Sequence, residues 1–370
     1  MEYLYKLEGY KFPRAHVESC VKDLEGYRYT RVVLEGARMF CKAVENGEAI
    51  DLSLKEFNNA ISDCRTWEDN DSFKDIFADL FDEYSTDTKI DRFQTGIACI
   101  DKVTGGFARG ELVTIGAKSG VGKSTLSLRI ALNIFKREDA KILLVSREMS
   151  ERQIGERILS THSGIDKHKF ENKTFDENDW QRLIQVMEYY SSDNFIIDTK
   201  CKTVEDVKRR VAKFKPDILI VDYLQLMTPL DGRVSRERQI ADISRELKNL
   251  TLDFNMVVIQ LSQLAEKGIG NYRPNGESYI RESRAPYHDS NIVIYIHEPN
   301  EQAELKQFLK SSSIEERKGM QVEEFETYVM RSKEEHGLRH QEIIVDKNRN
   351  GDTIRASYVV DMKRAFYAKF

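Results

Sequence analysis

Apolar residues recur in two different patterns along the chain, and the change falls near residue 90. Residues 1–68 show the i, i+3, i+4 spacing of short helices, for example over residues 29–44. From residue 90 onward, short apolar runs alternate with helical patterns. This alternation is typical of a mainly parallel sheet covered by helices, so we predict an α/β fold there. The predicted strands are Leu112–Gly116, Ile142–Ser146, Phe195–Ile197, Ile218–Asp222, Val257–Leu261, Ile292–Ile296 and Ile343–Val345.

Residues 71–84 carry a dense amphipathic pattern with an acidic opposite face. Its apolar positions are Phe73, Ile76, Phe77, Leu80, Phe81 and Tyr84. The helix could pack on its own domain or dock on a neighbouring subunit, and the pattern alone favours the first. We therefore predict a small helical N-terminal domain over 1–68, a linker helix and linker over 69–89, and an α/β domain over 90–370. A charged, helical stretch at 298–340 interrupts two predicted strands and is interpreted as a surface insertion.

The composition of the chain indicates a folded protein without membrane-spanning segments or a zinc ribbon. The chain has 370 residues, of which 40% are hydrophobic, so a packed core is expected rather than wholesale disorder. Its longest apolar runs fall short of the roughly 18–20 residues that span a bilayer, and the N-terminus lacks a signal pattern, so we expect a cytoplasmic protein without membrane contact. The five cysteines are dispersed, without a CxxC pair, as expected for reduced thiols and not for a zinc ribbon.

The net charge of −5 is unevenly distributed. Residues 1–90 hold 12 Lys and Arg against 19 Asp and Glu, so that the remainder of the chain carries a net charge of +2. A nucleic-acid site in the larger domain is therefore compatible with the composition, but it would have to be a local basic patch.

A phosphate-binding loop follows the first predicted strand of the α/β domain. The segment reads AKSGVGKST over 117–125 and leads into a helical pattern, which fits G-x-x-x-x-G-K-[ST] except for Ala117 at its first position. Small residues let backbone N–H groups surround phosphate oxygens, the lysine reaches the β- and γ-phosphates, and the serine ligates Mg²⁺. The predicted ATP-binding residues are Ala117, Ser119, Gly120, Val121, Gly122, Lys123, Ser124 and Thr125, with Ser124 also a metal ligand.

Three polar residues at predicted strand ends complete a candidate hydrolytic site. Asp222 follows four aliphatic residues, as expected for the carboxylate that holds Mg²⁺, here through a bound water. Glu148 comes shortly after the strand predicted at Ile142–Ser146 and could orient the attacking water, although a surface glutamate is an equally good interpretation of its position. Gln263 could sense the γ-phosphate, but glutamine is common after strands, so by itself this signal is weak.

These motifs, in this order, resemble the DnaB-type replicative helicases, which are hexameric RecA-like motors. The resemblance extends from Phe93 to the C-terminus and rests on several collinear segments. Those segments are TGIACIDKVTGGF (95–107), AKSGVGKST (117–125), SREM (146–149), DYLQLM (222–227), IADISRELK (240–248), LSQL (261–264), IRES (280–283) and KNRNG (347–351). The resemblance implies a RecA-like ATPase fold for 90–370, with ATP and Mg²⁺ as cofactors.

The resemblance also implies roles for individual residues. Glu148 would polarise water, and Gln263 would couple the γ-phosphate to loops that face DNA. Lys347 and Arg349 would reach the nucleotide of the neighbouring subunit, with Arg349 as an arginine finger. Without the resemblance, KNRNG would be interpreted as a basic turn between two strands.

A second set of residues would face single-stranded DNA in the central channel. Arg281, Glu282 and Arg284 form the loop that the resemblance places there, where Arg and main-chain N–H groups meet backbone phosphates. Arg233 and Arg236 follow the Asp222 motif and could add positive charge, or could belong to a solvated loop.

Three features depart from the family. Arg284 stands where the family has Gly, and Arg147 stands where it has Leu. Residues 1–68 do not align with the family's N-terminal domain, although the 71–84 helix sits where its linker helix docks. The 298–340 insertion looks longer than the family's equivalent.

The sequence therefore predicts a ring-forming replicative helicase that moves 5′→3′ on single-stranded DNA, in the bacterial cytosol and of phage or mobile-element type. A hexameric homo-oligomer, a helicase loader and a separate primase are the expected partners. Two alternatives stay open: a RecA-like recombination or repair ATPase that does not unwind DNA, and a non-motor regulator of a host helicase.

Overall fold

The computed structural model describes residues 92–370, except 139, 191, 230–232, 265–272, 278–279, 299–337, 363–365 and 370, together with four residues nearer the N-terminus. The chain divides into two compact units, Met1–Lys89 and Ile90–Phe370. In the first unit the described residues are helical and exposed, and they are Arg31, Arg38, Lys42 and Phe77. The predicted helix at 71–84 thus lies outside the described residues apart from Phe77, as does most of the predicted domain at 1–68.

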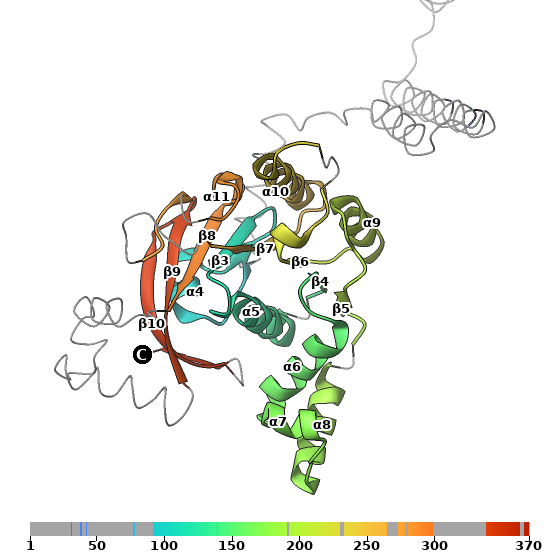
Figure 1. Ribbon diagram of the computed structural model, residues 1–370, viewed down its shortest axis with the longest axis vertical. Coiled ribbons are helices and arrows are strands. Elements are labelled where there is room, and N and C mark those ends of the chain that lie inside the picture. Colours follow the sequence, from blue (N-terminus) through green and yellow to red (C-terminus); the bar gives the residue numbers. More distant parts are fainter. Residues whose placement is uncertain are drawn as a thin grey trace, which may run out of the picture. The chain divides into compact units, whose positions relative to one another are not determined.

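A nine-stranded sheet forms the centre of the second unit, counting the strands in its described residues (Figure 1). The strand order is β11-β10-β9-β8-β3-β7-β6-β4-β5. From β8 to β5 all neighbours pair in parallel, whereas β9, β10 and β11 are antiparallel. The strands are β3 (Leu112–Ala117), β4 (Ile142–Ser146), β5 (Phe195–Asp198), β6 (Ile218–Asp222), β7 (Val257–Gln263), β8 (Ile292–His297), β9 (Leu338–Asn348), β10 (Ile354–Asp361) and β11 (Phe366–Lys369), beside a separate pair β1 (Arg92–Phe93) and β2 (Phe107–Ala108).

Helices cover both faces of this sheet. Side chains of α4 and α5 pack on one face in a core that includes Leu126 and Ile130, and side chains of α9 and α10 pack on the other face in a core that includes Val207 and Leu247. Helices α6, α7 and α8 project together beyond the β4 and β5 side of the sheet (Figure 1). The helices are α4 (Ala98–Thr104), α5 (Lys123–Glu138), α6 (Glu151–Ser163), α7 (Lys167–Asn172), α8 (Glu177–Tyr190), α9 (Val204–Phe214), the 3₁₀ helix η2 (Leu224–Leu226), α10 (Arg236–Asp253) and α11 (Ala285–Asp289).

Burial on both faces explains why the parallel strands are recognisable in the sequence. All residues of β3, β4, β6 and β8 are buried, so each strand is a continuous apolar run instead of an alternating one. The carboxyl ends of these strands meet at one edge of the sheet, which therefore collects the polar residues that follow each run. Among the described helices, none is long and apolar enough to cross a membrane.

The C-terminal part of the sheet differs from expectation. The short strand predicted at Ile343–Val345 is the centre of the much longer β9, and β10 and β11 were not predicted. The upper limit of the predicted 298–340 insertion is wrong, because Leu338–His340 already pair with β10 as strand residues. Residues 299–337 lie outside the described part of the chain.

Candidate active site and DNA-facing loop

The phosphate-binding loop connects β3 to α5 at the carboxyl edge of the sheet. β3 ends at Ala117 and α5 begins at Lys123, so the predicted loop residues lie between a strand and a helix N-terminus. Gly122 has φ +115°, and a Cβ there would lie 2.8 Å from Cε of Met362. A side chain at 122 would thus meet both a strained backbone and a close neighbour. The geometry leaves the N–H groups at the start of α5 free of side-chain bulk, as an anion cradle requires.

Glu148 and Asp222 lie at the ends of adjacent parallel strands beside this loop. β4 and β6 pair in register, with Ser146 opposite Asp222, and the Arg147 N–H donates to the carbonyl of Asp222 at 2.7 Å. Nζ of Lys123 lies 2.9 Å from Oε2 of Glu148. A capping box at the start of α6 fixes the chain that leads away from Glu148. The structure thus brings Lys123, Glu148 and Asp222 together, and turns Glu148 toward the loop lysine although that side chain is 44% exposed.

The Asp222 carboxyl is the least solvated acid of this group. The residue is 4% exposed, and burial raises the pKa of its carboxyl, while a hydrogen bond with Ser124 and the charge of Lys123 oppose that rise. Its Oδ1 atom is buried without a hydrogen-bond partner among the described residues. A buried carboxylate oxygen that lacks a partner and lies beside a serine hydroxyl fits a divalent cation bound with nucleotide phosphates. The residues present therefore fit Mg²⁺ and ATP.

Gln263 ends β7, next to the strand that carries the phosphate-binding loop. It lies opposite Ala117 in the β3–β7 pairing, and the following N–H of Leu264 donates to the Ala117 carbonyl at 2.9 Å. Its own carbonyl accepts from the N–H of Arg281 at 3.0 Å. The structure thus joins the end of the predicted sensor strand directly to the predicted DNA-facing loop.

Residues 281–284 form a tight loop held by ion pairs. Glu282 has φ +71°, and its carboxylate accepts from Nε of Arg236 at 2.8 Å and lies 3.6 Å from Nε of Arg281. Arg236 also donates through Nη2 to the carbonyl of Gln225. Arg236 therefore holds the loop from α10, whereas half of the Arg281 side chain and 65% of the Arg284 side chain are exposed. Arg233 lies in the exposed turn before α10.

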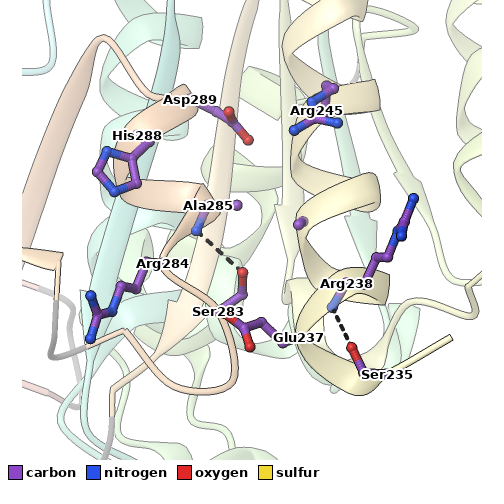
Figure 2. A pocket seen from close by; sticks show the side chains of 10 residues that line it. Ser235, Glu237, Arg238, Arg245, Ser283, Arg284, Ala285, His288 and Asp289 are labelled. Atoms are coloured by element: carbon purple, nitrogen blue, oxygen red, sulfur yellow. Dashed lines mark hydrogen bonds between the residues drawn. The ribbon is translucent and has the colours of Figure 1, made fainter.

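A shallow cavity of about 460 Å³ separates this loop and α11 from α10. Figure 2 shows that Arg238 and Arg245 come from α10, and that Arg284 and His288 lie on the opposite wall and point away from α10. Arg284 and His288 both contact Glu277, at 3.1 Å in the case of Arg284. The guanidinium groups of Arg238 and Arg245, by contrast, have no ion-pair partner within the described residues. The wall formed by α10 thus adds positive charge beside the predicted DNA-facing loop.

Lys347 and Arg349 lie at the opposite edge of the sheet from the phosphate-binding loop. β9 runs antiparallel to β8, so that Asn348 pairs with Ile292 at the beginning of β8. Nζ of Lys347 donates to the carbonyls of Tyr287 and His288 at 2.6 and 3.0 Å, and Nη2 of Arg349 donates to the His288 carbonyl at 2.8 Å. Burial, and then the charge of Arg349, lowers the pKa of Lys347. Neither side chain can reach the phosphate-binding loop of its own subunit from this edge.

Two residues of β9 that the sequence did not indicate contact the phosphate-binding loop, and Glu298, directly after β8, holds both of them. Gln341 donates to the Val121 carbonyl at 2.6 Å, and Arg339 donates to the Gly120 carbonyl at 2.8 Å. Oε2 of the buried Glu298 lies 3.1 Å from the Gln341 amide and 3.5 Å from the Arg339 guanidinium. These residues flank the 299–337 segment, and no motif marks them, so nothing in the sequence pointed to this contact.

Comparison with known proteins places these features in a family. The family described as DnaB-like helicase C-terminal domain matches residues 93–367. The replicative DNA helicase DnaB of Helicobacter pylori strain 26695 is 31% identical over 276 residues, which cover 70% of this chain and 55% of that protein. That of Geobacillus stearothermophilus is 26% identical over 338 residues, which cover 86% of this chain and 74% of that protein. The chain spans little more than half the length of the Helicobacter relatives that it matches.

Two solved structures have a similar fold. A solved ATPase domain superposes with a TM-score of 0.65 at 25% identity, covering 82% of this chain and all of that one. A structure that describes a DnaB-like replicative helicase and its interactions with primase superposes with a TM-score of 0.69 at 23% identity, covering all of this chain and 83% of that one. At that identity, the second match shows the fold alone.

Proposed function

The chain belongs to the family of DnaB-like helicase C-terminal domains, and from this premise we propose that it is an ATP-driven replicative DNA helicase. ATP bound with Mg²⁺ between subunits of a ring would drive 5′→3′ translocation on single-stranded DNA and unwinding of the duplex. The observation that carries this proposal is the hydrogen bond between the Gln263 carbonyl and the Arg281 N–H, because it joins the ATP site to the DNA-facing loop.

The side chains around the phosphate-binding loop support ATP hydrolysis. Mg²⁺ bound with ATP would supply a positive charge that stabilises the transferring phosphoryl group. Ser124 and Asp222 would hold the metal ion, and the charge of the ion would favour the ionised form of the buried Asp222 carboxyl, against the effect of burial. Lys123 pairs with Glu148 in this structure, and phosphate oxygens would compete for the same ammonium group. Glu148 would thereby be released to accept the proton of the attacking water, so that general-base function depends on bound nucleotide.

The positions of Lys347 and Arg349 support a ring of identical subunits. Both lie at the edge of the sheet opposite the phosphate-binding loop, so they could complete only the site of a second copy. An arginine supplied by a neighbour makes turnover depend on assembly, since it stabilises charge that develops in the transition state. We propose a hexamer, in keeping with the resemblance of the sequence motifs.

The loop at 281–284 would contact the DNA backbone without reading its sequence. Arg281 and Arg284 are the exposed cations of this loop, and Arg238 adds positive charge from α10. Such contacts to phosphates are sequence-independent and weaken with salt. Arg236 would act by holding Glu282, and the position of Arg233 in an exposed turn allows contact with DNA. In the bacterial cytosol, a loader and a separate primase would be the further partners.

Unwinding of forked duplexes tests the proposal. Forks with a 5′ or a 3′ single-stranded tail on the loading strand are incubated with the full chain, ATP and Mg²⁺, with Lys123→Ala as the control. The proposal requires unwinding that needs the 5′ tail and is lost in the variant. DNA-stimulated turnover without unwinding by a ring-forming protein would favour the recombination or repair ATPase. Full biological effect of Lys123→Ala would instead favour a non-motor regulator.

A further inference from the structure

Gln225 is a buried amide between the ATP site and the DNA-facing loop. It lies in the 3₁₀ helix η2, three residues after Asp222, and is 9% exposed. Its position brings the side chain to the ends of β6 and β7 at the carboxyl edge of the sheet.

The side-chain amide of Gln225 contacts two separate segments of the chain. Its Nε2 donates to Oγ of Ser262 at 3.0 Å and to the carbonyl of Arg281 at 3.4 Å, and its Oε1 accepts from the N–H of Gln263 at 3.3 Å. One amide group thus holds the end of the sensor strand and the first residue of the DNA-facing loop.

The main chain of Gln225 provides a further contact with the same loop. Its carbonyl accepts from Nη2 of Arg236, and Nε of that guanidinium donates to Glu282 at 2.8 Å. Two adjacent loop residues, Arg281 and Glu282, are therefore connected to Gln225, one directly and one through Arg236. A buried polar group that loses its hydrogen-bond partners costs about 1–3 kcal/mol. Gln225, the end of β7 and residues 281–282 should therefore move together and not separately.

We infer that Gln225 is a positioning residue that transmits the state of the nucleotide site to the DNA-facing loop, and the state of the loop back to the site. This inference rests on the proposed helicase function and adds a device for its regulation. A shift of Gln263 at the end of β7 would move the Gln225 amide, and the amide would move the backbone at Arg281. Gln225 needs no contact with either ligand for this role.

Gln260 offers a matched control on the same sheet. It is a fully buried glutamine of β7, and its Nε2 donates to Oγ1 of Thr114 at 2.8 Å and to Oγ of Ser244 at 3.4 Å. Its contacts therefore lie on β3 and α10, away from residues 281–284. Replacement of either glutamine by methionine keeps the side-chain length and removes the hydrogen bonds, and only at Gln225 are those bonds made to the end of β7 and to Arg281.

The experiment compares Gln225→Met and Gln260→Met with the wild-type full chain. The rate of ATP turnover is measured without DNA and with saturating oligo(dT), and the ratio of the two rates is the readout. Thermal unfolding of each variant reports the loss of stability. We expect Gln225→Met to lower the stimulation ratio at least about fivefold, the lower end of typical coupling between sites. Gln260→Met should keep the wild-type ratio within about twofold, because its contacts do not include residues 281–284.

Each outcome separates this inference from the proposed function. A wild-type chain that oligo(dT) does not stimulate would argue against the proposed function itself. If oligo(dT) stimulates the wild type and Gln225→Met keeps the same stimulation ratio, the inference about Gln225 is overturned while the proposed function stands. The same holds if both methionine variants lose the stimulation ratio equally. If Gln225→Met does not fold, Gln225→Glu takes its place, since it can still accept from Gln263 but cannot donate to the Arg281 carbonyl. A wild-type ratio in Gln225→Glu would overturn the inference equally.

Discussion

Asp222→Asn should stabilise the protein without nucleotide while abolishing Mg²⁺-dependent ATP turnover. The carboxyl is buried, burial raises its pKa, and Oδ1 has no hydrogen-bond partner among the described residues. An ionised carboxylate is therefore held where solvation is poor, whereas an amide of the same shape carries no charge. Because burial disfavours the ionised carboxylate and not the neutral amide, we expect Asp222→Asn to raise the free energy of unfolding. In a domain of this size, each 1 kcal/mol of that gain would raise Tm by roughly 2–4 °C.

The pH dependence of this gain has a defined sign. The folded state binds the Asp222 proton more tightly than the unfolded chain, since the pKa of the folded carboxyl lies above the ordinary value of 3.8. The wild-type protein therefore loses stability as the pH rises from 3.8 through the raised pKa, and the loss is complete above it. Asp222→Asn should consequently show its full gain at high pH and a shrinking gain as the pH falls toward 3.8.

Thermal unfolding from pH 4 to pH 8 measures this effect, because the change begins near the ordinary pKa of 3.8. Asp217→Asn is the matched control at the other end of β6, because Oδ1 of Asp217 lies 2.6 Å from Nη2 of Arg109 and Oδ2 accepts from the N–H of Lys141. Both oxygens of the Asp217 carboxylate thus have partners, so Asp217→Asn should lower Tm. Addition of Mg²⁺ and a non-hydrolysable ATP analogue should then stabilise the wild type more than Asp222→Asn. A lower Tm for Asp222→Asn at neutral pH, or a gain that does not change with pH, would refute the reasoning.

Three further substitutions test the remaining parts of the site. Glu148→Gln should lower kcat about 10²- to 10⁴-fold with ATP binding retained, and rapid turnover in that variant would exclude Glu148 as the general base. Arg349→Ala should lower the rate of ATP turnover about 10³-fold or more. Mixing this variant with Lys123→Ala subunits, which carry an intact Arg349, should restore part of that rate. A mixture that is as inactive as each variant alone would contradict an arginine supplied by the neighbouring subunit. Gly122→Ala should weaken ATP binding through its φ of +115° and its 2.8 Å approach to Met362. Adding Met362→Ala should recover only part of that affinity, whereas full recovery would show that backbone strain is unimportant there.

The parallel half of the sheet could be predicted from the sequence, whereas the antiparallel half could not. β3, β4, β6 and β8 are largely apolar runs because both of their faces are covered, and β7 begins with three aliphatic residues, so each can be recognised locally. β10 mixes buried and exposed positions and lies toward the edge of the sheet, where the apolar pattern is weak. The full length of β9 depends on its pairing with β8 and β10, and that pairing is a non-local property.

Among the residues of the candidate site, those within local sequence motifs could be predicted, whereas those defined by contacts between distant segments could not. Lys123 and Asp222 could be predicted because each follows a recognisable strand within a short motif whose chemistry is local. The position of Glu148 in the sequence fits a surface glutamate equally well, and only the structure brings its carboxylate to 2.9 Å from Nζ of Lys123. Gln225 lies inside the DYLQLM segment, yet its importance comes from contacts with residues 37 and 56 positions away. Such contacts exist only once β7 and the 281–284 loop have been brought to the end of β6.

β9 illustrates what this long-range pairing contributes to function. Its first residues, Arg339 and Gln341, hold the carbonyls of the phosphate-binding loop in their own subunit, and near its end Lys347 projects at the opposite edge of the sheet. An extended strand rises about 3.4 Å per residue, so β9 runs from one edge of the parallel strands to the other, with a shift in its register against β8 between Val293 and Ile294. If Lys347 and Arg349 reach a neighbouring nucleotide, two successive sites of the ring are then connected by one strand. A displacement of the phosphate-binding loop in one site would be transmitted along β9 to the residues that complete the next site.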